Sequence, residues 1–324
     1  MAASSNWEMC PPNPPLKLLA GYGLEQGAPD EVIDSVIDTA LEAGYRHIDT
    51  AYVYGNEAAI GKALKRWFDS GKIKREELFI VTKLPMVGLQ ADKVEKYLNR
   101  SLAALQLTYV DLYLIHFPCG LEEKGENLFP QDESGNLILD KTTEHVSLWK
   151  SMEAQVDAGK ARSIGLSNFN AQQIKRIVKS ARIPPANLQV ELHVFFQQKE
   201  LVAFCKALDI TVVAYAPIGS PGIYDIPNLS PLNDPVVVKI AQKHKKSPAQ
   251  ILLRHIVQRG IAVIPKSANP VRIKENFDFF DITLDDQDVN ELNALDRGKN
   301  GRLFSSAMLR GIEKHPEDPF KEPY

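Results

Sequence analysis

The sequence predicts an α/β protein folded as a (β/α)8 TIM barrel with long loops at its C-terminal face. Eight short runs rich in β-branched and aromatic residues alternate with segments of helical periodicity along the chain. Such alternation is typical of parallel sheets, because each pair of parallel strands needs a helix-length crossover. No predicted strand leads into a G-x-G-x-x-G turn or a P-loop, which favours the barrel over a doubly wound open sheet.

Strand and helix signals follow one another regularly. Residues 31–44 place apolar side chains at the spacing of an amphipathic helix. Ser247, Pro248 and Gln250 provide an N-cap, an N1 proline and a capping-box partner for a later helix, and Gly260 follows its end. The predicted strands cover residues 16–21, 45–50, 77–83, 111–116, 162–167, 187–192, 211–217 and 262–267.

The chain is expected to form a single barrel domain over residues 1–324, since barrels routinely exceed about 200 residues. Prolines near both ends predict extended, loosely held tails at residues 1–15 and about 303–324. Two connections are longer than a barrel requires, residues 118–144 and residues 219–233. Both follow the C-terminal ends of strands, where barrel enzymes carry their sites; surface insertions without a role are the alternative.

Composition and charge exclude several classes of protein. The 44% hydrophobic and 24% charged residues are ordinary globular usage, and a net charge of −3 offers no positive excess for nucleic acid. The three cysteines, Cys10, Cys119 and Cys205, are too few and too far apart for a disulfide framework or a paired-cysteine metal site. Without a signal peptide or a membrane-length apolar run, we expect a cytoplasmic protein that binds neither membranes nor nucleic acid.

Three successive predicted strands end in polar side chains that strand propensity does not explain. Asp49, Lys83 and His116 each follow an apolar run, and Tyr54 comes shortly after the first of them. Because side chains alternate along a strand, Lys83 and His116 share faces with the preceding apolar residues and are expected to point into the barrel mouth. Each residue alone has an ordinary structural explanation, but four such residues at one rim of the predicted barrel favour a catalytic site.

The four residues suit proton donation. A lysine in the barrel mouth needs a counter-charge, because desolvation lowers the pKa of an unpaired buried lysine, and Asp49 is the nearest candidate in strand order. A phenol with an ordinary pKa of about 10 is a poor acid at neutral pH. The ammonium of Lys83 would stabilise phenolate and make Tyr54 a better proton donor. His116 could donate a hydrogen bond to the same oxygen and orient a carbonyl.

Three stretches in this order resemble the signatures of the aldo-keto reductase family. They are GYRHIDTAYVYGNEAAIG at residues 44–61, VDLYLIHFP at 110–118 continuing to SIGLSNFN at 163–170, and IPKSANPVRIKEN at 264–276. The resemblance extends from about Leu18 to Arg302, nearly the whole chain. It implies a (β/α)8 barrel that binds NADPH extended across its C-terminal mouth and acts on a small-molecule carbonyl substrate. Family members are often monomers, which we expect here.

The resemblance also implies a role for each residue of the four. Tyr54 is the general acid, Lys83 and Asp49 tune it, and His116 orients the substrate carbonyl, with Phe117 beside it in the substrate pocket. Hydride then moves from the nicotinamide to the carbonyl carbon while Tyr54 protonates the oxygen, which yields an alcohol. No metal is expected.

The expected cofactor residues follow from the same matching. Lys266 and Arg272 would place two cations around the 2′-phosphate, which NADPH carries and NADH lacks. Charge-assisted contacts to this extra phosphate favour the binding of NADPH over that of NADH. The residues are Ser167, Asn168 and Gln189 for the carboxamide, Tyr215 for stacking on the ring, Ala216, Pro217, Ile218, Gly219 and Ser220 for the pyrophosphate, Lys266, Ser267, Ala268, Asn269 and Arg272 for the 2′-phosphate, and Glu275 and Asn276 for adenine.

The chain departs from the family pattern at bulky positions. It reads GYGLEQG at residues 21–27, where the first strand of the family usually ends in glycine, threonine and tryptophan. Pro85 and Phe117 stand where tryptophan is common. A wider pocket is therefore expected, suited to a bulky or apolar carbonyl such as a steroid, an isoprenoid or an aromatic compound.

Two other functions stay open. An NADPH-binding sensor or subunit with little turnover would keep the nucleotide site. A barrel lyase would use Lys83 as a Schiff-base nucleophile, but it would leave Lys266 and Arg272 without a role. His193 and His255 are interpreted as packing or rim residues, because no second ligand stands at metal spacing.

Overall fold

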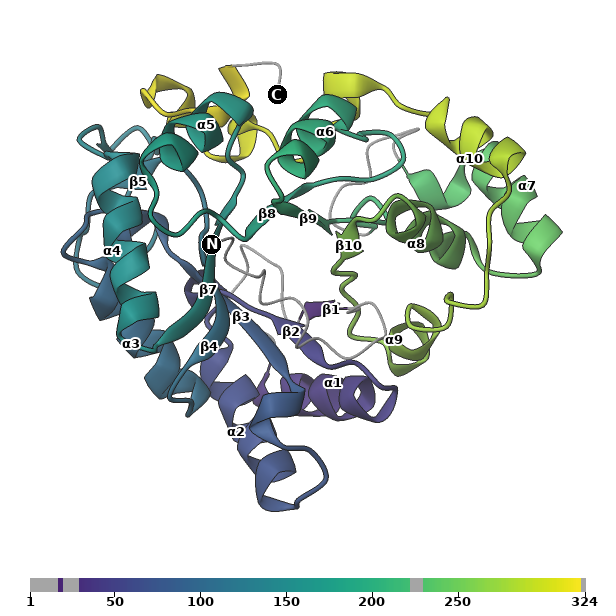
Figure 1. The fold of residues 1–324 in the computed structure, drawn as a ribbon, viewed down its shortest axis with the longest axis horizontal. Coiled ribbons are helices and arrows are strands. Elements are labelled where there is room, and N and C mark those ends of the chain that lie inside the picture. The colour runs from purple at the N-terminus through teal and green to yellow at the C-terminus, as the bar shows by residue number, and fades with distance from the viewer. Residues whose placement is uncertain (1–16, 20–28, 222–229, 322–324) are drawn as a thin grey trace.

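The computed structural model of the chain describes residues 17–19, 29–221 and 230–321. All eight predicted strands are present in one parallel sheet, ordered β1-β2-β3-β4-β7-β8-β9-β10. Figure 1 shows this sheet curled, with helices around its outside, in a barrel-like arrangement. The strands are β1 (Lys17–Leu19), β2 (His47–Asp49), β3 (Phe79–Leu84), β4 (Val110–Ile115), β7 (Ala161–Ser167), β8 (Asn187–Glu191), β9 (Thr211–Tyr215) and β10 (Ala262–Val263).

Closure of the barrel stays a prediction. Within the described ranges the pairings run from β1 to β10, and none joins β10 back to β1. The N-terminal tail, Cys10 and the GYGLEQG stretch all lie outside the described residues. No helix in the described part of the chain is both long enough and apolar enough to cross a membrane.

Ten α-helices lie within the described ranges, and the predicted helix signals are confirmed. Ser247 caps α8: its Oγ accepts from the Gln250 amide at 3.3 Å, and the Gln250 side chain accepts from the Ser247 amide at 2.9 Å. The helices are α1 (Asp30–Glu42), α2 (Glu57–Asp69), α3 (Val94–Leu105), α4 (His145–Asp157), α5 (Ala171–Ser180), α6 (Lys199–Ala207), α7 (Pro235–His244), α8 (Pro248–Gln258), α9 (Pro270–Glu275) and α10 (Asp286–Asn293).

Alternate residues of the central strands face opposite sides of the sheet. Ile80 and Tyr113 join the main core, which also contains apolar residues of the surrounding helices. Val81, Leu112 and Leu114 form a separate buried cluster of their own. Because side chains alternate along a strand, Lys83 shares the side of Val81, as the sequence predicts. This inner side leads to the site.

The long connection after β4 has structure of its own. β5 (Gly120–Leu121) and β6 (Leu139–Asp140) pair in an antiparallel sheet within it. Glu144 then caps α4 by accepting from the amides of Val146 and Ser147, both at 2.8 Å.

The expectation of a loosely held C-terminal tail is wrong for residues 303–321. This segment forms three 3-10 turns, Ser306–Met308, Ile312–Lys314 and Pro319–Lys321. It buries Leu303 and Phe304, and Ile312 is fully buried in the main core. Prolines signal an extended chain locally, but they are equally compatible with turns, and the burial of apolar side chains decides the outcome here.

Candidate active site

Lys83 and Asp49 form a buried ion pair at the ends of neighbouring strands. Lys83 is the next-to-last residue of β3 and Asp49 the last of β2, and both side chains are 0% exposed. The Lys83 ammonium bonds to Oδ1 of Asp49 and also donates to the Thr50 carbonyl oxygen at 2.9 Å. The second carboxylate oxygen of Asp49 accepts from Nε2 of Gln189 at 2.7 Å. Two predicted catalytic residues and one predicted cofactor residue are therefore in direct contact.

Tyr54 lies on a short turn beside this pair. The 3-10 turn Tyr52–Tyr54 follows β2 and ends at Gly55, whose φ of 66° is a left-handed conformation that suits glycine. The Lys83 Nζ lies 5.2 Å from the centroid of the Tyr54 ring. The ring of His116 meets the Tyr54 ring edge-on, with centroids 5.6 Å apart and an interplanar angle of 81°. The structure thus brings the four predicted catalytic residues together.

Burial and charge shift the pKa values of these groups. Burial lowers the pKa of Lys83, while the charges of Asp49 and, more weakly, Glu57 act in the opposite direction. Burial, together with the nearby Lys83 charge, holds the pKa of His116 well below its usual range. His116 is therefore a neutral imidazole at physiological pH, which suits a hydrogen-bond donor rather than an acid.

The residues expected beside the nicotinamide form hydrogen bonds with one another and with the backbone of His116, one of the four predicted catalytic residues. Asn168, which follows β7, donates from Nδ2 to the His116 carbonyl oxygen at 3.0 Å and lies 3.2 Å from the Ser167 hydroxyl. The Tyr215 hydroxyl, at the end of β9, donates to Oδ1 of Asn168 at 2.9 Å. The Tyr215 ring is held edge-on against Phe304 of the C-terminal segment, with centroids 5.4 Å apart. Three strand ends thus converge on Asn168.

The backbone turns sharply after β9, where the pyrophosphate is expected. Ala216, Gly219 and Ser220 all have positive φ, at 51°, 82° and 48°. A Cβ on Gly219 would lie 2.4 Å from a Pro231 ring carbon, so only glycine fits this close approach. Pro217 is buried and Ile218 packs against the main core.

The residues expected at the 2′-phosphate lie at the start of α9. Asn269 caps this helix, accepting from the amides of Val271 and Arg272 at 2.9 and 3.1 Å. Arg272 Nε lies 3.4 Å from the hydroxyl of the buried Ser267. Lys266 and Arg272 are exposed, and neither forms an ion pair with any residue of the described ranges. Two cations beside one turn without carboxylate partners fit a phosphate group.

The remaining expected cofactor residues surround this turn. Ala268 is exposed beside Asn269, Glu275 is half-buried, and Asn276 is buried after the last residue of α9. The adenine end of the expected site is thus a short stretch of chain, whereas the nicotinamide end is assembled from several strands.

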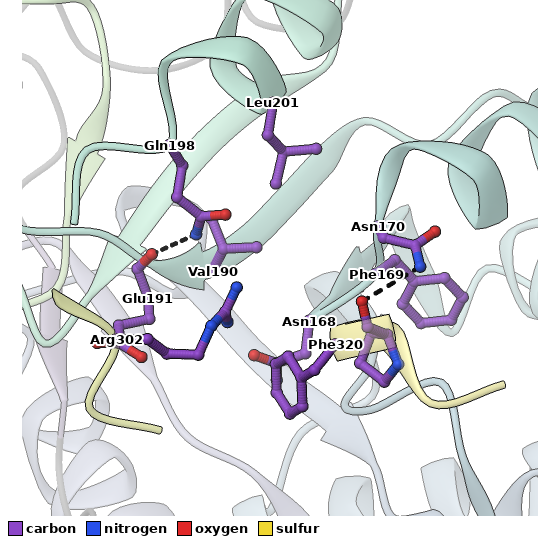
Figure 2. A pocket seen from close by; sticks show the side chains of 10 residues that line it. Asn168, Phe169, Asn170, Val190, Glu191, Gln198, Leu201, Arg302 and Phe320 are labelled. Atoms are coloured by element: carbon purple, nitrogen blue, oxygen red, sulfur yellow. Dashed lines mark hydrogen bonds between the residues drawn. The ribbon is translucent and has the colours of Figure 1, made fainter. Parts of the chain in front are cut away.

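A small cavity lies beside the four residues rather than among them. Its volume of about 20 Å³ suits about one water molecule, not a substrate. Figure 2 shows its wall formed by Asn168, Glu191 and Gln198 from the barrel and by Arg302 and Phe320 from the C-terminal segment. Asn168 is the one residue it shares with the expected site.

Sequence reasoning missed a buried carboxylate at the end of β8. Glu191 accepts from the amides of Leu303 and Phe304 at 2.7 and 2.9 Å and from Nε2 of His193 at 2.9 Å. The signal was available: Glu191, like Asp49, is a carboxylate at the last position of a buried strand. His193 is fully buried on this carboxylate, and His255 bonds to Asn293 at 2.9 Å, so both are packing residues.

Comparison with known proteins gives a consistent result. Residues 19–297 match the model of the Aldo/keto reductase family. The chain is 43% identical over 317 residues to aldo-keto reductase family 1 member A1 of Mus musculus, covering 94% of this chain and 95% of that protein. It is 42% identical over 306 residues to dihydrodiol dehydrogenase 3 of Bos taurus, covering 92% and 93%. The solved aldose reductase from Schistosoma japonicum matches with a TM-score of 0.87 and 42% identity, covering 96% of each chain.

Proposed function

Because the chain belongs to the aldo/keto reductase family, whose members are oxidoreductases of carbonyl and alcohol groups, we propose that it reduces aldehydes or ketones to alcohols with NADPH. The observation that carries this proposal is the convergence of Tyr54, Lys83, Asp49 and His116 at the ends of β2, β3 and β4. When bound, NADPH supplies the hydride that the carbonyl carbon accepts. The protein then has to orient the carbonyl and deliver a proton to its oxygen.

Tyr54 is the proton donor in this proposal. Its ring lies beside a fully buried ammonium, and a positive charge so close stabilises the phenolate that remains after the proton has left. The charge of Asp49 opposes the lowering of the Lys83 pKa by burial. His116, neutral and edge-on to Tyr54, donates a hydrogen bond to the carbonyl oxygen and so sets its orientation.

The cofactor preference rests on charge. Ser167, Asn168 and Gln189 would hold the nicotinamide carboxamide, since their amide and hydroxyl groups lie around the four residues. Lys266 and Arg272, which have no ion-pair partner among the residues that the structure describes, would bind the 2′-phosphate, which NADH lacks.

The substrate class rests on the departures from the family pattern. Phe117 is buried and contacts Phe320 edge-on, with centroids 5.9 Å apart, so one wall near His116 is aromatic and shared with the C-terminal segment. Together with Pro85 in place of a common tryptophan, this supports a bulky or apolar carbonyl: a steroid, an isoprenoid or an aromatic aldehyde. A lyase using Lys83 is disfavoured, because its ammonium is enclosed and already paired with Asp49.

A substrate panel tests the proposal. Purified protein is mixed with NADPH or NADH and with an aromatic aldehyde, a steroid ketone, an isoprenoid aldehyde and an aldose sugar, and the loss of reduced-nicotinamide absorbance is followed. We expect turnover with NADPH and the apolar carbonyls, and much weaker turnover with NADH. Binding of NADPH without turnover on any carbonyl would instead indicate a sensor, and activity confined to small polar sugars would contradict the substrate class.

A further inference from the structure

A buried side-chain hydrogen bond closes the turn that carries Tyr54. The Thr50 hydroxyl donates to Oδ1 of Asn56 at 2.7 Å, and the two residues are 0% and 4% exposed. Tyr54 lies between them, on a 3-10 turn that belongs to no strand of the barrel. The bond therefore ties together the two ends of the segment that presents the phenol.

Capping of α2 does not account for this bond. Asn56 occupies the N-cap position of α2, where an asparagine side chain commonly accepts from a helix amide. Here its side chain makes no capping hydrogen bond to the helix. Its carbonyl oxygen instead points back to Thr50, across the turn.

Thr50 also holds Lys83. The carbonyl oxygen of Thr50 accepts from the Lys83 ammonium at 2.9 Å, and the Thr50 amide donates to the Val81 carbonyl oxygen at 2.9 Å. The same residue thus bonds to the lysine through its backbone and to the far end of the Tyr54 turn through its side chain.

A second bond fastens the turn to the strand that carries Lys83. Glu57, the first residue of α2, accepts from the hydroxyl of Thr82 at 2.5 Å, and both residues are buried. Thr82 directly precedes Lys83 in β3. The turn is consequently bracketed by two hydroxyl hydrogen bonds, one from Thr50, directly after β2, and one from Thr82 in β3.

From these contacts we infer that Thr50 and Asn56 are positioning residues for proton transfer: their hydrogen bond sets where the Tyr54 phenol lies relative to the Lys83 ammonium. The inference rests on the proposed function, in which Tyr54 is the acid. Neither residue is one of the four that the proposed function places at the carbonyl. Their loss should weaken the chemical step without weakening cofactor binding, because the expected cofactor residues lie in or just after β7, β8 and β9 and in and around α9.

A double-mutant cycle in the full-length protein tests the inference. Thr50→Val removes the donor with little change of shape, Asn56→Ala removes the acceptor, and Thr50→Ser restores the hydroxyl. The readouts are the single-turnover rate with saturating NADPH, its pH dependence, the affinity for NADPH and the melting temperature. Thr39→Val is the matched control, since it removes a threonine hydroxyl bond, to Ser35 at 2.8 Å, in the peripheral helix α1.

We expect each single variant to lose about ten- to a hundredfold in single-turnover rate, the effect of misplacing a catalytic group by up to about 1 Å. The double variant should be no slower than the slower single variant, because both remove one bond. NADPH affinity should be unchanged, and Thr50→Ser should recover most of the rate. If Thr50→Val does not fold, Asn56→Ala gives the same comparison from the acceptor side.

The outcomes separate this inference from the proposed function. A wild-type protein without NADPH-dependent turnover overturns both. Wild-type turnover that both variants retain overturns the positioning role alone, as does a rate loss that Thr50→Ser fails to recover. Additive losses in the double variant would show two independent structural effects and would also overturn it.

Discussion

The ammonium nitrogen of Lys83 lies 5.2 Å from the centroid of the Tyr54 ring, although the two residues come from different elements. Lys83 is fully buried near the end of β3, whereas Tyr54 is half-buried on a turn. The charge is thus enclosed, while Tyr54 keeps part of its surface exposed. In the proposed mechanism, the buried cation would act on Tyr54 as the acid that protonates the substrate.

Replacement of Asp49 by asparagine should move the alkaline limb of the activity profile to lower pH. Asp49 opposes the effect of burial on the pKa of Lys83, so its loss lowers that pKa further. A lysine loses its proton as pH rises, and a lower pKa means that the loss comes earlier. The pH dependence of kcat for wild type and Asp49→Asn checks this, with Asp34→Asn in α1 as a surface control. An alkaline limb at the same pH in wild type and Asp49→Asn would show that Asp49 does not raise the pKa of Lys83.

Replacement of Arg272 by alanine should weaken NADPH binding and leave NADH binding unchanged. A lost charge-assisted contact to a phosphate costs about 1.5–3 kcal/mol, or about ten- to a hundredfold in affinity. Lys274→Ala removes an exposed cation from the same helix and serves as the control. Fluorescence titration with both dinucleotides measures the effect. Equal losses for NADPH and NADH would place Arg272 away from the 2′-phosphate.

Replacement of Glu191 by glutamine should loosen the C-terminal segment. The carboxylate accepts three buried hydrogen bonds, two of them from the amides of Leu303 and Phe304. A neutral amide satisfies fewer of these donors, so we expect a loss of about 1–3 kcal/mol in the free energy of unfolding. Urea unfolding and limited proteolysis of the segment measure this, with the exposed Glu313→Gln as control. Unaltered stability together with unaltered cleavage would refute the anchoring role.

The parallel sheet and three of the four central residues could be predicted from the sequence for a simple physical reason. Parallel strands end at one edge of the sheet, so polar residues that close successive apolar runs must meet there. Asp49, Lys83 and His116 follow this rule. Glu191 follows it as well, yet its two backbone partners, the amides of Leu303 and Phe304, lie 112 and 113 positions away along the chain.

The C-terminal segment could not be read correctly from local signals. Its prolines indicate an extended chain, and no periodic pattern indicates burial. Leu303 and Phe304 are nevertheless held against β8 by their backbone amides, which no residue type encodes. The bond between Thr50 and Asn56 was equally hidden, since a threonine after a strand and an asparagine before a helix each have an ordinary local reading.

Acid should destabilise the folded protein partly through His255. Burial lowers the pKa of this fully buried histidine from 6.5 to about 4. Between pH 6.5 and about 4, His255 binds a proton in the unfolded chain but not in the folded chain. The contribution of His255 to the free energy of unfolding is therefore fully present above pH 6.5 and is lost as the pH falls toward 4. This difference is worth about 3 kcal/mol. Urea unfolding from pH 7 to 4 should show a shallower pH dependence for His255→Gln, and an identical slope would contradict the assignment.

The Tyr54→Phe variant tests the central claim most directly. It removes one hydroxyl and keeps the ring beside Lys83 and His116. With saturating NADPH and an aromatic aldehyde, we predict a single-turnover rate at least about a hundredfold below wild type, with NADPH affinity unchanged. A Tyr54→Phe protein that reduces the aldehyde at the wild-type rate would contradict the account.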